Sequence, residues 1–147
     1  MRPHASVSEK IKEYESFLDD KLKAELGRTI ERRDKLLETL SQYLALRNQL
    51  ELIRDSGMKS LKTKINLGSE FYVQANVPDT EFVYVDIGLG FRVQYTIQEA
   101  MNFIDKKEAA LNASVDKCTR QSAQIKSDIK MVCNAIGELL ELQPPSQ

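Results

Sequence analysis

The side chains that could do chemistry in this chain are few, and their spacing does not favour catalysis. His4 is the single histidine, so the sequence offers no histidine base near a nucleophile and no set of histidines for zinc. Aspartate and glutamate are plentiful, but along the helical stretches they alternate with lysine and arginine, as on any solvated helix face. We therefore expect no enzymatic activity, no metal and no other cofactor.

The two cysteines, Cys118 and Cys133, are too far apart to form a disulfide with each other. They lie fifteen residues apart in what we expect to be one helix, which at about 1.5 Å per residue separates them by about 22 Å. A disulfide needs α-carbons less than about 7 Å apart. Free thiols are typical of reducing compartments, so we expect the protein in the cytoplasm and the nucleus.

Gly88-Leu89-Gly90-Phe91 is the segment most easily mistaken for a binding loop. It resembles a dinucleotide-binding loop, but a third glycine is missing and a strand pattern follows instead of a helix. It also resembles the carboxylate-binding loop of PDZ domains, a β-rich fold that has no place for two long helices. We interpret the segment as a hairpin turn, because glycine adopts turn conformations with little strain.

Charge and composition exclude several classes of partner. The 147 residues include 21 Lys and Arg against 22 Asp and Glu, for a net charge of −1. This balance gives no footprint for direct binding of nucleic acid or of an anionic membrane. The first residues lack the apolar core of a secretion signal, and no apolar run could span a bilayer. The composition suits long solvated helices that contact other proteins.

A seven-residue apolar repeat between Met101 and Leu139 is the longest regular feature of the sequence. Its twelve positions alternate in steps of three and four residues, and ten of them are apolar. A stripe with this period requires a second helix along its whole length, wound around it in a left-handed supercoil. The twelve positions are Met101, Ile104, Glu108, Leu111, Val115, Cys118, Ser122, Ile125, Ile129, Val132, Ile136 and Leu139.

A second apolar series predicts a helix over residues 8–55. The pair Ser56-Gly57 that follows is a typical helix stop. Between Leu18 and Ile30 the apolar residues follow each other at intervals of four, a slip from the heptad that should relax the supercoil. The series is Val7, Ile11, Tyr14, Leu18, Leu22, Leu26, Ile30, Leu37, Leu40, Leu44, Leu50 and Ile53.

Between the helices, residues 60–97 change to the alternating pattern of β-strands. Apolar residues alternate with polar ones over 61–67 and again over 71–75, with Gly68-Ser69 between them, which predicts a β-hairpin. After a turn at 77–80, the run 81–87 is apolar on both faces, and the turn at 88–90 leads into a fourth run. We expect two hairpins that together form one four-stranded sheet.

This order of elements predicts an α+β fold, a long antiparallel coiled-coil hairpin with two β-hairpins at its base. The helices, 8–55 and 98–142, are nearly equal in length, so residue i of the first should face about residue 153 − i of the second. We expect a single domain over 1–147, with flexible tails at 1–7 and 143–147. The bare edges of the sheet predict oligomerisation through the strands.

With these elements in place, the sequence resembles the α-class subunits of the prefoldin family and, more closely, a prefoldin-like branch of that class. The α class has two hairpins between its helices, whereas the β class has one. The resemblance covers nearly the whole chain, apart from its first residues and the Pro144-Pro145 tail. It is carried by the order and spacing of the segments 33–48, 67–68, 77–80, 88–91, 99–100 and 103–107.

The resemblance implies a non-catalytic chaperone or co-chaperone subunit of a heterohexamer built from two α-type and four β-type chains. Its partners would be other prefoldin or prefoldin-like subunits, joined through the strands, and unfolded or assembling client proteins held at the ends of the helices. The alternative is a transcriptional coregulator or centrosome-associated adaptor whose coiled coil binds partner proteins such as transcription regulators.

Carried onto this sequence, the resemblance assigns two sets of contact residues. The strand residues expected to join subunits are Leu61, Ile65, Leu67, Phe71, Val73, Phe82, Val83, Tyr84, Val85, Ile87, Phe91, Val93 and Tyr95. The tip residues expected to hold clients or partners are Val7, Ile11, Tyr14, Ile136, Leu139, Leu140 and Leu142.

The sequence leaves two questions open. The tip residues either bind clients or merely seal the end of the coiled coil. Glu108 and Ser122, the two polar residues of the C-terminal repeat, either fix the register of the helices or, in the case of Glu108, lean out to solvent opposite Leu44 or Ala45.

Overall fold

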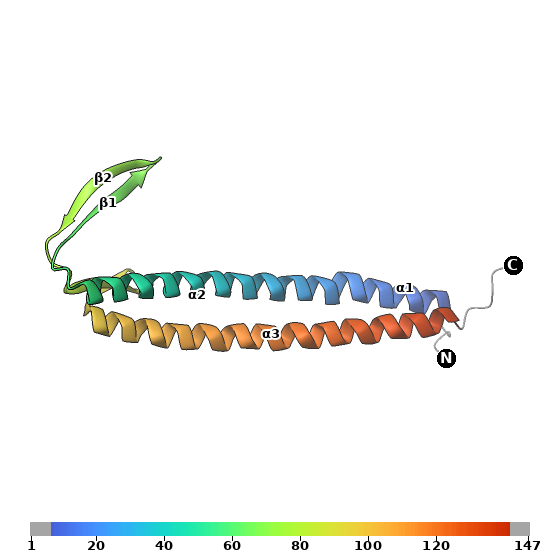
Figure 1. Cartoon of the computed structure of the whole chain (residues 1–147). Helices are drawn as coiled ribbons and strands as arrows, with labels where there is room; N and C mark the ends of the chain where they lie inside the picture. Colours follow the sequence, from blue (N-terminus) through green and yellow to red (C-terminus); the bar gives the residue numbers. More distant parts are fainter. Residues whose placement is uncertain (1–6, 142–147) are drawn as a thin grey trace. The chain divides into compact units, whose positions relative to one another are not determined.

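The computed structural model describes residues 7–141, and its elements follow the predicted order of helix, two hairpins and helix (Figure 1). The N-terminal helical stretch consists of α1 (Val7–Phe17), the π-helical segment η1 (Leu18–Lys23) and α2 (Ala24–Ser56). The strands are β1 (Leu61–Gly68), β2 (Phe71–Val77), β3 (Phe82–Gly88) and β4 (Phe91–Thr96), and α3 (Ile97–Glu141) follows them. The α+β fold class is as predicted.

The chain divides into two compact units, which we describe separately. The coil unit contains residues 7–38 and 112–141, and the hairpin unit contains Thr39–Leu111. Of the predicted flexible tails, all of 143–147 and all of 1–7 except Val7 lie outside the described residues, as does Leu142. Their flexibility stays a prediction.

Within the hairpin unit, α2 and α3 run antiparallel close to the predicted register. Arg47 Nη1 lies 2.8 Å from Asp105 Oδ1, and Arg54 Nη1 donates a hydrogen bond of 3.5 Å to the Sδ atom of Met101. Both contacts are within two residues of the expected pairing of i with 153 − i. In the coil unit, Thr29 and Gln121 line one shallow cavity, so the N-terminal stretch and α3 are neighbours there too.

The buried face of α3 follows the predicted heptad. All twelve positions of the repeat are buried or half-buried. In the coil unit Cys118, Ser122 and Ile125 are buried, and in the hairpin unit Met101 and Ile104 are buried. A regular alternation of three and four residues thus determines which side of α3 faces the other helix.

The N-terminal stretch departs from the predicted continuous helix at Leu18, where six residues form η1. Here Leu18, Leu22 and Leu26 follow each other at intervals of four. A π-helical turn holds more residues than an α-helical one, so it keeps Leu18 and Leu22 on the same buried face. The π-segment therefore absorbs the slip in the heptad that the sequence contains.

Beyond η1, the buried face of α2 differs from the predicted one. The predicted seam residues Leu37 and Leu44 are exposed. The prediction is correct at Ile30, Leu40, Leu50 and Ile53, which are buried or half-buried. It is wrong at Leu37 and Leu44 because it followed the leucines, whereas the packed face also includes a threonine and two arginines. In steps of four and three residues, the buried and half-buried positions are Thr29, Arg33, Leu36, Leu40, Tyr43, Arg47 and Leu50.

The four strands form two separate two-stranded sheets, and the expected single four-stranded sheet is wrong. In the first hairpin Ile65 pairs with Val73 and Leu61 with Val77. In the second, Val85 pairs with Val93 and Val83 with Tyr95. Each hairpin satisfies its own turn and inner hydrogen bonds, but the outer edges of all four strands have no partner strand within residues 7–141.

The two hairpins turn through the same backbone geometry. In each, an aspartate or asparagine side chain accepts a hydrogen bond of 2.8 Å from the N–H of the glycine two residues later, Asn66 from Gly68 and Asp86 from Gly88. The two residues that follow both have positive φ: 48° and 64° in the first hairpin, 56° and 79° in the second. This pattern fits type I′ turns, which match the right-handed twist of paired strands.

The second hairpin packs on the helices of the hairpin unit, whose core is Leu50, Ala100, Met101 and Ile104. Val83, Val85 and Tyr95 pack against that core from β3 and β4. At the base of the hairpins the buried Thr80 donates a hydrogen bond from its hydroxyl to the carbonyl of Met58. This bond ties the segment before β1 to the segment before β3.

Candidate functional site

The first hairpin presents an apolar face that no core of the described chain covers. By strand alternation, Ile65 and Val73 share one face, and their directly paired side chains are 50% and 45% exposed. The opposite face is mostly polar and carries Lys62, Lys64 and Gln74, together with the exposed Tyr72. No residue of β1 or β2 belongs to the core cluster of the hairpin unit. Exposed apolar faces of this kind mark interaction surfaces.

The second hairpin differs from the first, because β3 is apolar on both faces and one of these faces is covered. The face with Val83 and Val85 packs on the helices, while Phe82 and Tyr84 on the other face are exposed. A strand that is apolar on both faces was the prediction for this run, and the structure shows the reason for it. One face belongs to the core, and the other presents aromatic side chains to solvent.

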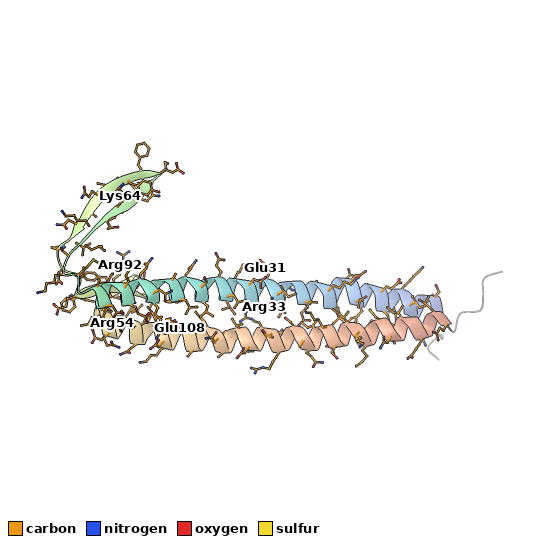
Figure 2. The ribbon with its side chains drawn as sticks, in the orientation of Figure 1. Glu31, Arg33, Arg54, Lys64, Arg92 and Glu108 are labelled. Carbon is orange, nitrogen blue, oxygen red and sulfur yellow. The ribbon has the colours of Figure 1, made fainter. Side chains whose placement is uncertain are left out.

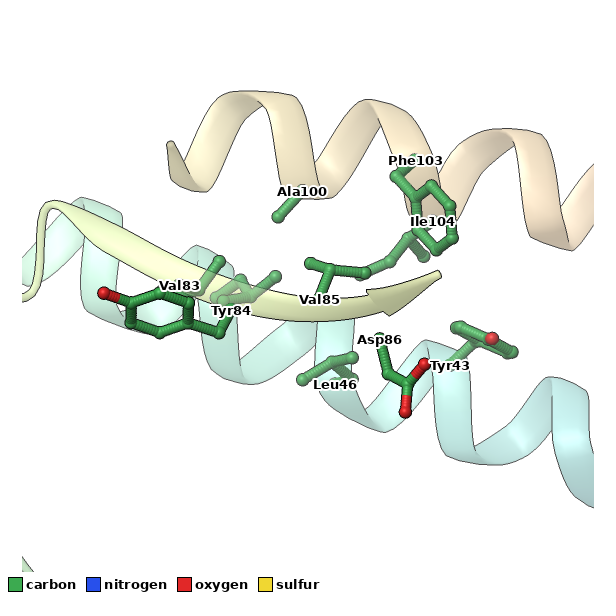
Figure 3. Close-up of a pocket in the computed structure, with 10 residues that line it drawn as sticks. Tyr43, Leu46, Val83, Tyr84, Val85, Asp86, Ala100, Phe103 and Ile104 are labelled. Carbon is green, nitrogen blue, oxygen red and sulfur yellow. The ribbon is translucent and has the colours of Figure 1, made fainter. Parts of the chain in front are cut away.

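An apolar groove of about 270 Å³ runs along β3 within the hairpin unit (Figure 3). Four consecutive residues of β3, two from each face, line it, but no residue of β4 does, so the groove borders the free edge of β3. In Figure 3 the α2 side chains of Tyr43 and Leu46 and the α3 side chains of Phe103 and Ile104 flank the strand. Asp86 is the one carboxylate among the ten lining residues.

The strand residues that were predicted to join subunits include both exposed and half-buried side chains. Eight are exposed, and Leu61, Val83, Val85, Val93 and Tyr95 are half-buried. The groove brings Val83, Tyr84 and Val85 together with residues that sequence reasoning missed. A search for apolar residues beside the predicted seams could have found both Leu46, two residues after Leu44, and Phe103, next to Ile104. The exposed members are Ile65, Leu67, Phe71, Val73, Phe82, Tyr84, Ile87 and Phe91.

The predicted tip residues are divided between seam and surface. Val7, Tyr14 and Leu140 are exposed, whereas Ile11 is buried and Ile136 and Leu139 are half-buried in the seam. Leu142 lies outside the described residues. The structure thus places some tip residues in the seam and leaves others exposed, and client binding by the exposed ones stays a prediction.

A shallow apolar cavity of about 190 Å³ in the coil unit adds residues that the sequence did not indicate. Tyr14 of α1 lines it together with Met131, Val132 and Ala135 of α3. Met131 is 68% exposed, and Phe17, one turn from Tyr14, is also exposed. The cavity has no charged lining residue, so it suits apolar side chains of a partner.

Glu108 does not lean out to solvent. Its side chain is 16% exposed, and its Oε2 atom lies 3.5 Å from Arg47 Nη1. Figure 2 labels Glu108 on α3. Arg47 also contacts Asp105 and Glu51. The hydrogen bond to Glu51 and the negative charges of Asp105 and Glu108 raise the pKa of Arg47. This cluster links α2 to α3 at one position along their length, as expected of polar residues that fix the register of two paired helices.

Two kinds of feature are not found in the described part of the chain, a cluster of metal ligands and a membrane-spanning helix. Between residues 7 and 141, no three His, Cys, Asp or Glu side chains are grouped so that they could hold a metal ion. No helix in the same range is long and apolar enough to cross a membrane. The candidate functional site consists of the apolar surfaces and the groove described above, on the hairpins and the helices.

Comparison with models of protein families shows to which family the chain belongs. Residues 12–141, which is most of the chain, match the model described as "Prefoldin subunit". The chain belongs to the prefoldin family. The order of its elements, with two hairpins between two long helical stretches, is the one that the sequence predicted for that family's α class.

Similarity to individual proteins narrows the position of this chain within the prefoldin family. It is 47% identical to "Protein UXT homolog" of Dictyostelium discoideum over 133 residues, which cover 90% of this chain and 83% of the relative. It is 39% identical to "Protein UXT" of Rattus norvegicus over 138 residues, which cover 94% of this chain and 88% of the relative. The prefoldin-like branch that the sequence indicated is thus the one that contains the UXT proteins.

Among solved structures, the chain is similar to one described as the cryo-EM structure of filamentous PFD from Methanocaldococcus jannaschii. The two share 18% sequence identity and superpose with a TM-score of 0.43. The similarity covers 92% of this chain and 99% of that chain.

Proposed function

We propose that this chain is a non-catalytic subunit of a prefoldin-like heterohexamer, joined to other α- and β-type subunits through its hairpins. The observation that carries the proposal is the uncovered apolar face of the first hairpin at Ile65 and Val73. An isolated two-stranded hairpin is marginally stable in water, and its outer edges are open to further strands. Docking on a neighbouring subunit supplies both the cover and the strand partner that the hairpin lacks.

We further propose that the helices hold unfolded or assembling client proteins. Support comes from the exposed apolar side chains Tyr14, Phe17, Met131 and Leu140 in the coil unit. Aromatic residues and methionine are enriched in interfaces, and methionine adapts to partners of varied shape. A chaperone that binds many sequences needs adaptable apolar contacts without a fixed pattern of hydrogen bonds.

The same exposed side chains also favour a second candidate function, that of an adaptor. In it the coiled coil binds one partner helix, for example on a transcription regulator or a centrosomal protein. In helix-in-groove binding the partner helix inserts its apolar side chains into an apolar groove, and the coil-unit cavity lined by Tyr14 and Met131 could receive one of them. We propose the cytoplasm and nucleus as compartments, since Cys118 and Cys133 are free thiols that suit reducing conditions.

The assembly proposal is tested by replacing Val73 with lysine in the full chain. Val73 lies on the uncovered apolar face, so Val73→Lys should remove the other subunits from the complex purified from its own cells, as measured by native mass spectrometry. Val85→Asp is a poorer choice, because Val85 packs on the core of the hairpin unit and its loss would disturb the fold.

Tyr72→Lys is the matched control, because Tyr72 pairs with Asn66 on the polar face of the same hairpin. We expect Tyr72→Lys to assemble normally and both variants to keep their helical circular dichroism. A wild-type chain that is monomeric in its own cells, or a Val73→Lys variant that retains every subunit, would contradict the proposal.

A further inference from the structure

The two hairpins share their turn geometry but carry opposite kinds of side chain at the apex. In the first hairpin the two central turn residues are Ser69 and Glu70, which are polar. In the second they are Leu89 and Gly90. Because the backbones are alike, this difference is not dictated by the turn itself.

Leu89 is unfavourable at its position for two independent reasons. Its φ of 56° lies in the left-handed region, where a branched apolar side chain is strained and type I′ turns prefer asparagine or glycine. Its side chain is also 97% exposed, the highest value among the exposed large apolar residues of the described chain. An asparagine there would relieve the strain and suit the solvent. A leucine that fails on both counts indicates a contact outside this chain.

Leu89 does not stand alone, because the tip of the second hairpin is apolar as a whole. Ile87 and Phe91 are exposed on either side of it, and Gly88 and Gly90 complete the tip. The nearest charges along the chain are Asp86 before the tip and Arg92 after it, which are opposite each other in the register of β3 and β4. The tip is therefore a small apolar projection with a cation and an anion at its base.

We propose that this hairpin tip inserts Leu89 into an apolar groove on a neighbouring prefoldin-type subunit, one that has a carboxylate at its rim. The groove beside β3 of this chain is the pattern for such a receptor, since it holds about 270 Å³ and has Asp86 as its carboxylate. Arg92 at the base of the inserted tip would meet that carboxylate, so the charges are complementary. The inference rests on the proposed assembly through hairpins and specifies one of its contacts.

The groove of this chain, taken as the pattern for the receptor, lies beside a strand edge that has no partner strand in residues 7–141. The groove borders the free edge of β3, and residues from both faces of the strand line it, so a segment entering there meets unpaired backbone as well as apolar side chains. Tyr43 and Phe103 line it from the two helices. The pocket can cover the apolar side chain at the tip, while the strand edge offers free backbone groups to the polar backbone of the turn.

The test is Leu89→Asn in the full chain, purified with its native partners. Asn-Gly is the preferred sequence for a type I′ turn, so the hairpin should keep its fold and the Tm of the isolated chain should stay level or rise. The dissociation constant of the complex should increase roughly 10- to 100-fold, because one fully buried leucine contact is lost. Leu89→Met, which preserves the apolar side chain, should assemble with no more than a small loss.

Ser69→Asn is the matched control, since it makes the same kind of change at the equivalent position of the first hairpin. It should leave assembly unchanged. Normal assembly of Leu89→Asn, or an equal loss for Ser69→Asn, overturns the inference. If Leu89→Asn assembles while Val73→Lys does not, the proposed function stands without this contact. If both assemble, the inference and the proposed function fail together.

Discussion

Single polar side chains determine how the helices start and how they pair. Glu108 and Arg47 lie within the packed faces of α3 and α2, and their ion pair links the two helices at one position along their length. Glu99 acts at the first turn of α3, where its Oε2 atom accepts hydrogen bonds of 2.9 Å from the N–H and the hydroxyl of Thr96. The Thr96 hydroxyl in turn accepts a bond from the N–H of Glu99, which completes a capping box. Although neither residue is apolar, Glu108 limits the registers in which α2 and α3 can pair, and Glu99 limits where α3 can begin.

The capping box predicts a specific dependence of stability on pH. The backbone N–H of Thr96 and then its hydroxyl lower the pKa of Glu99 below the ordinary value of 4.5. A carboxyl whose pKa is lowered in the folded state stabilises the fold at pH above its unfolded-state pKa, and this stabilisation is lost as the pH falls through the folded-state value. Glu99→Gln should therefore lower the unfolding midpoint in urea at about pH 7 but differ little from the wild type at about pH 3.

The control for this prediction is Glu138→Gln, a carboxyl in the last turns of the same helix. It changes the same chemical group without touching the capping box, so its effect should not follow the pattern of Glu99→Gln. Equal destabilisation by Glu99→Gln at neutral and at acid pH would show that the lost charge does not act through Thr96.

At the scale of elements, the sequence predicts the buried face of a helix well where the apolar period is regular. It predicts that face poorly where either of two neighbouring leucines could be the buried one. All twelve positions of the α3 repeat face inward, since no alternative stripe of similar quality exists in that helix. In α2, Leu36 and Leu37 are adjacent, and only the position of the partner helix decides that Leu36 is inside. Whether the two predicted hairpins pair with each other depends on tertiary packing, which strand patterns do not encode. The groove beside β3 likewise required the structure, because its residues come from three separate elements.

The π-helical segment gives an element-scale prediction. A π-segment of this kind accommodates one extra residue in a helix. Deleting Asp20 should therefore convert η1 into regular α-helix while Ile11, Leu18 and Leu22 stay on the packed face. The deletion removes the hydrogen bond of 2.9 Å from Ser16 to Asp20, which is exposed and contributes little. We expect Tm to remain within about 2 °C of the wild type or to rise.

Deletion of Asp34 provides the contrast, because α2 is regular α-helix there. Removing a residue from a regular heptad rotates every earlier seam position away from α3, so Tm should fall by many degrees or cooperative unfolding should be lost. Thermal unfolding followed by circular dichroism distinguishes the two cases. An Asp20 deletion as damaging as the Asp34 deletion would show that η1 is required for the packing of the coil unit.

At the scale of the whole molecule, assembly and client binding draw on different surfaces and can be separated. The hairpin unit carries the uncovered strands and the groove, and the coil unit carries the exposed Tyr14, Phe17, Met131 and Leu140. Leu139 is half-buried in the α3 seam, so replacing it would test packing as much as binding. Met131 and Leu140 are better choices, because their side chains are 68% and 52% exposed.

The double variant Met131→Ser, Leu140→Ser should leave the complex and its helicity intact but weaken the holding of unfolded proteins. Each exposed apolar side chain that a client would cover contributes to binding roughly in proportion to its buried area, so the concentration of complex needed to suppress aggregation should rise by roughly tenfold or more. The assay follows light scattering of a chemically denatured protein diluted into the purified complex. Leu52→Ser is the matched control, since Leu52 is 67% exposed but lies on α2 in the hairpin unit. If the double variant and the control suppress aggregation as well as the wild type does, the exposed residues of the coil unit are not the client surface, and the adaptor function with a single partner helix becomes the better explanation for them.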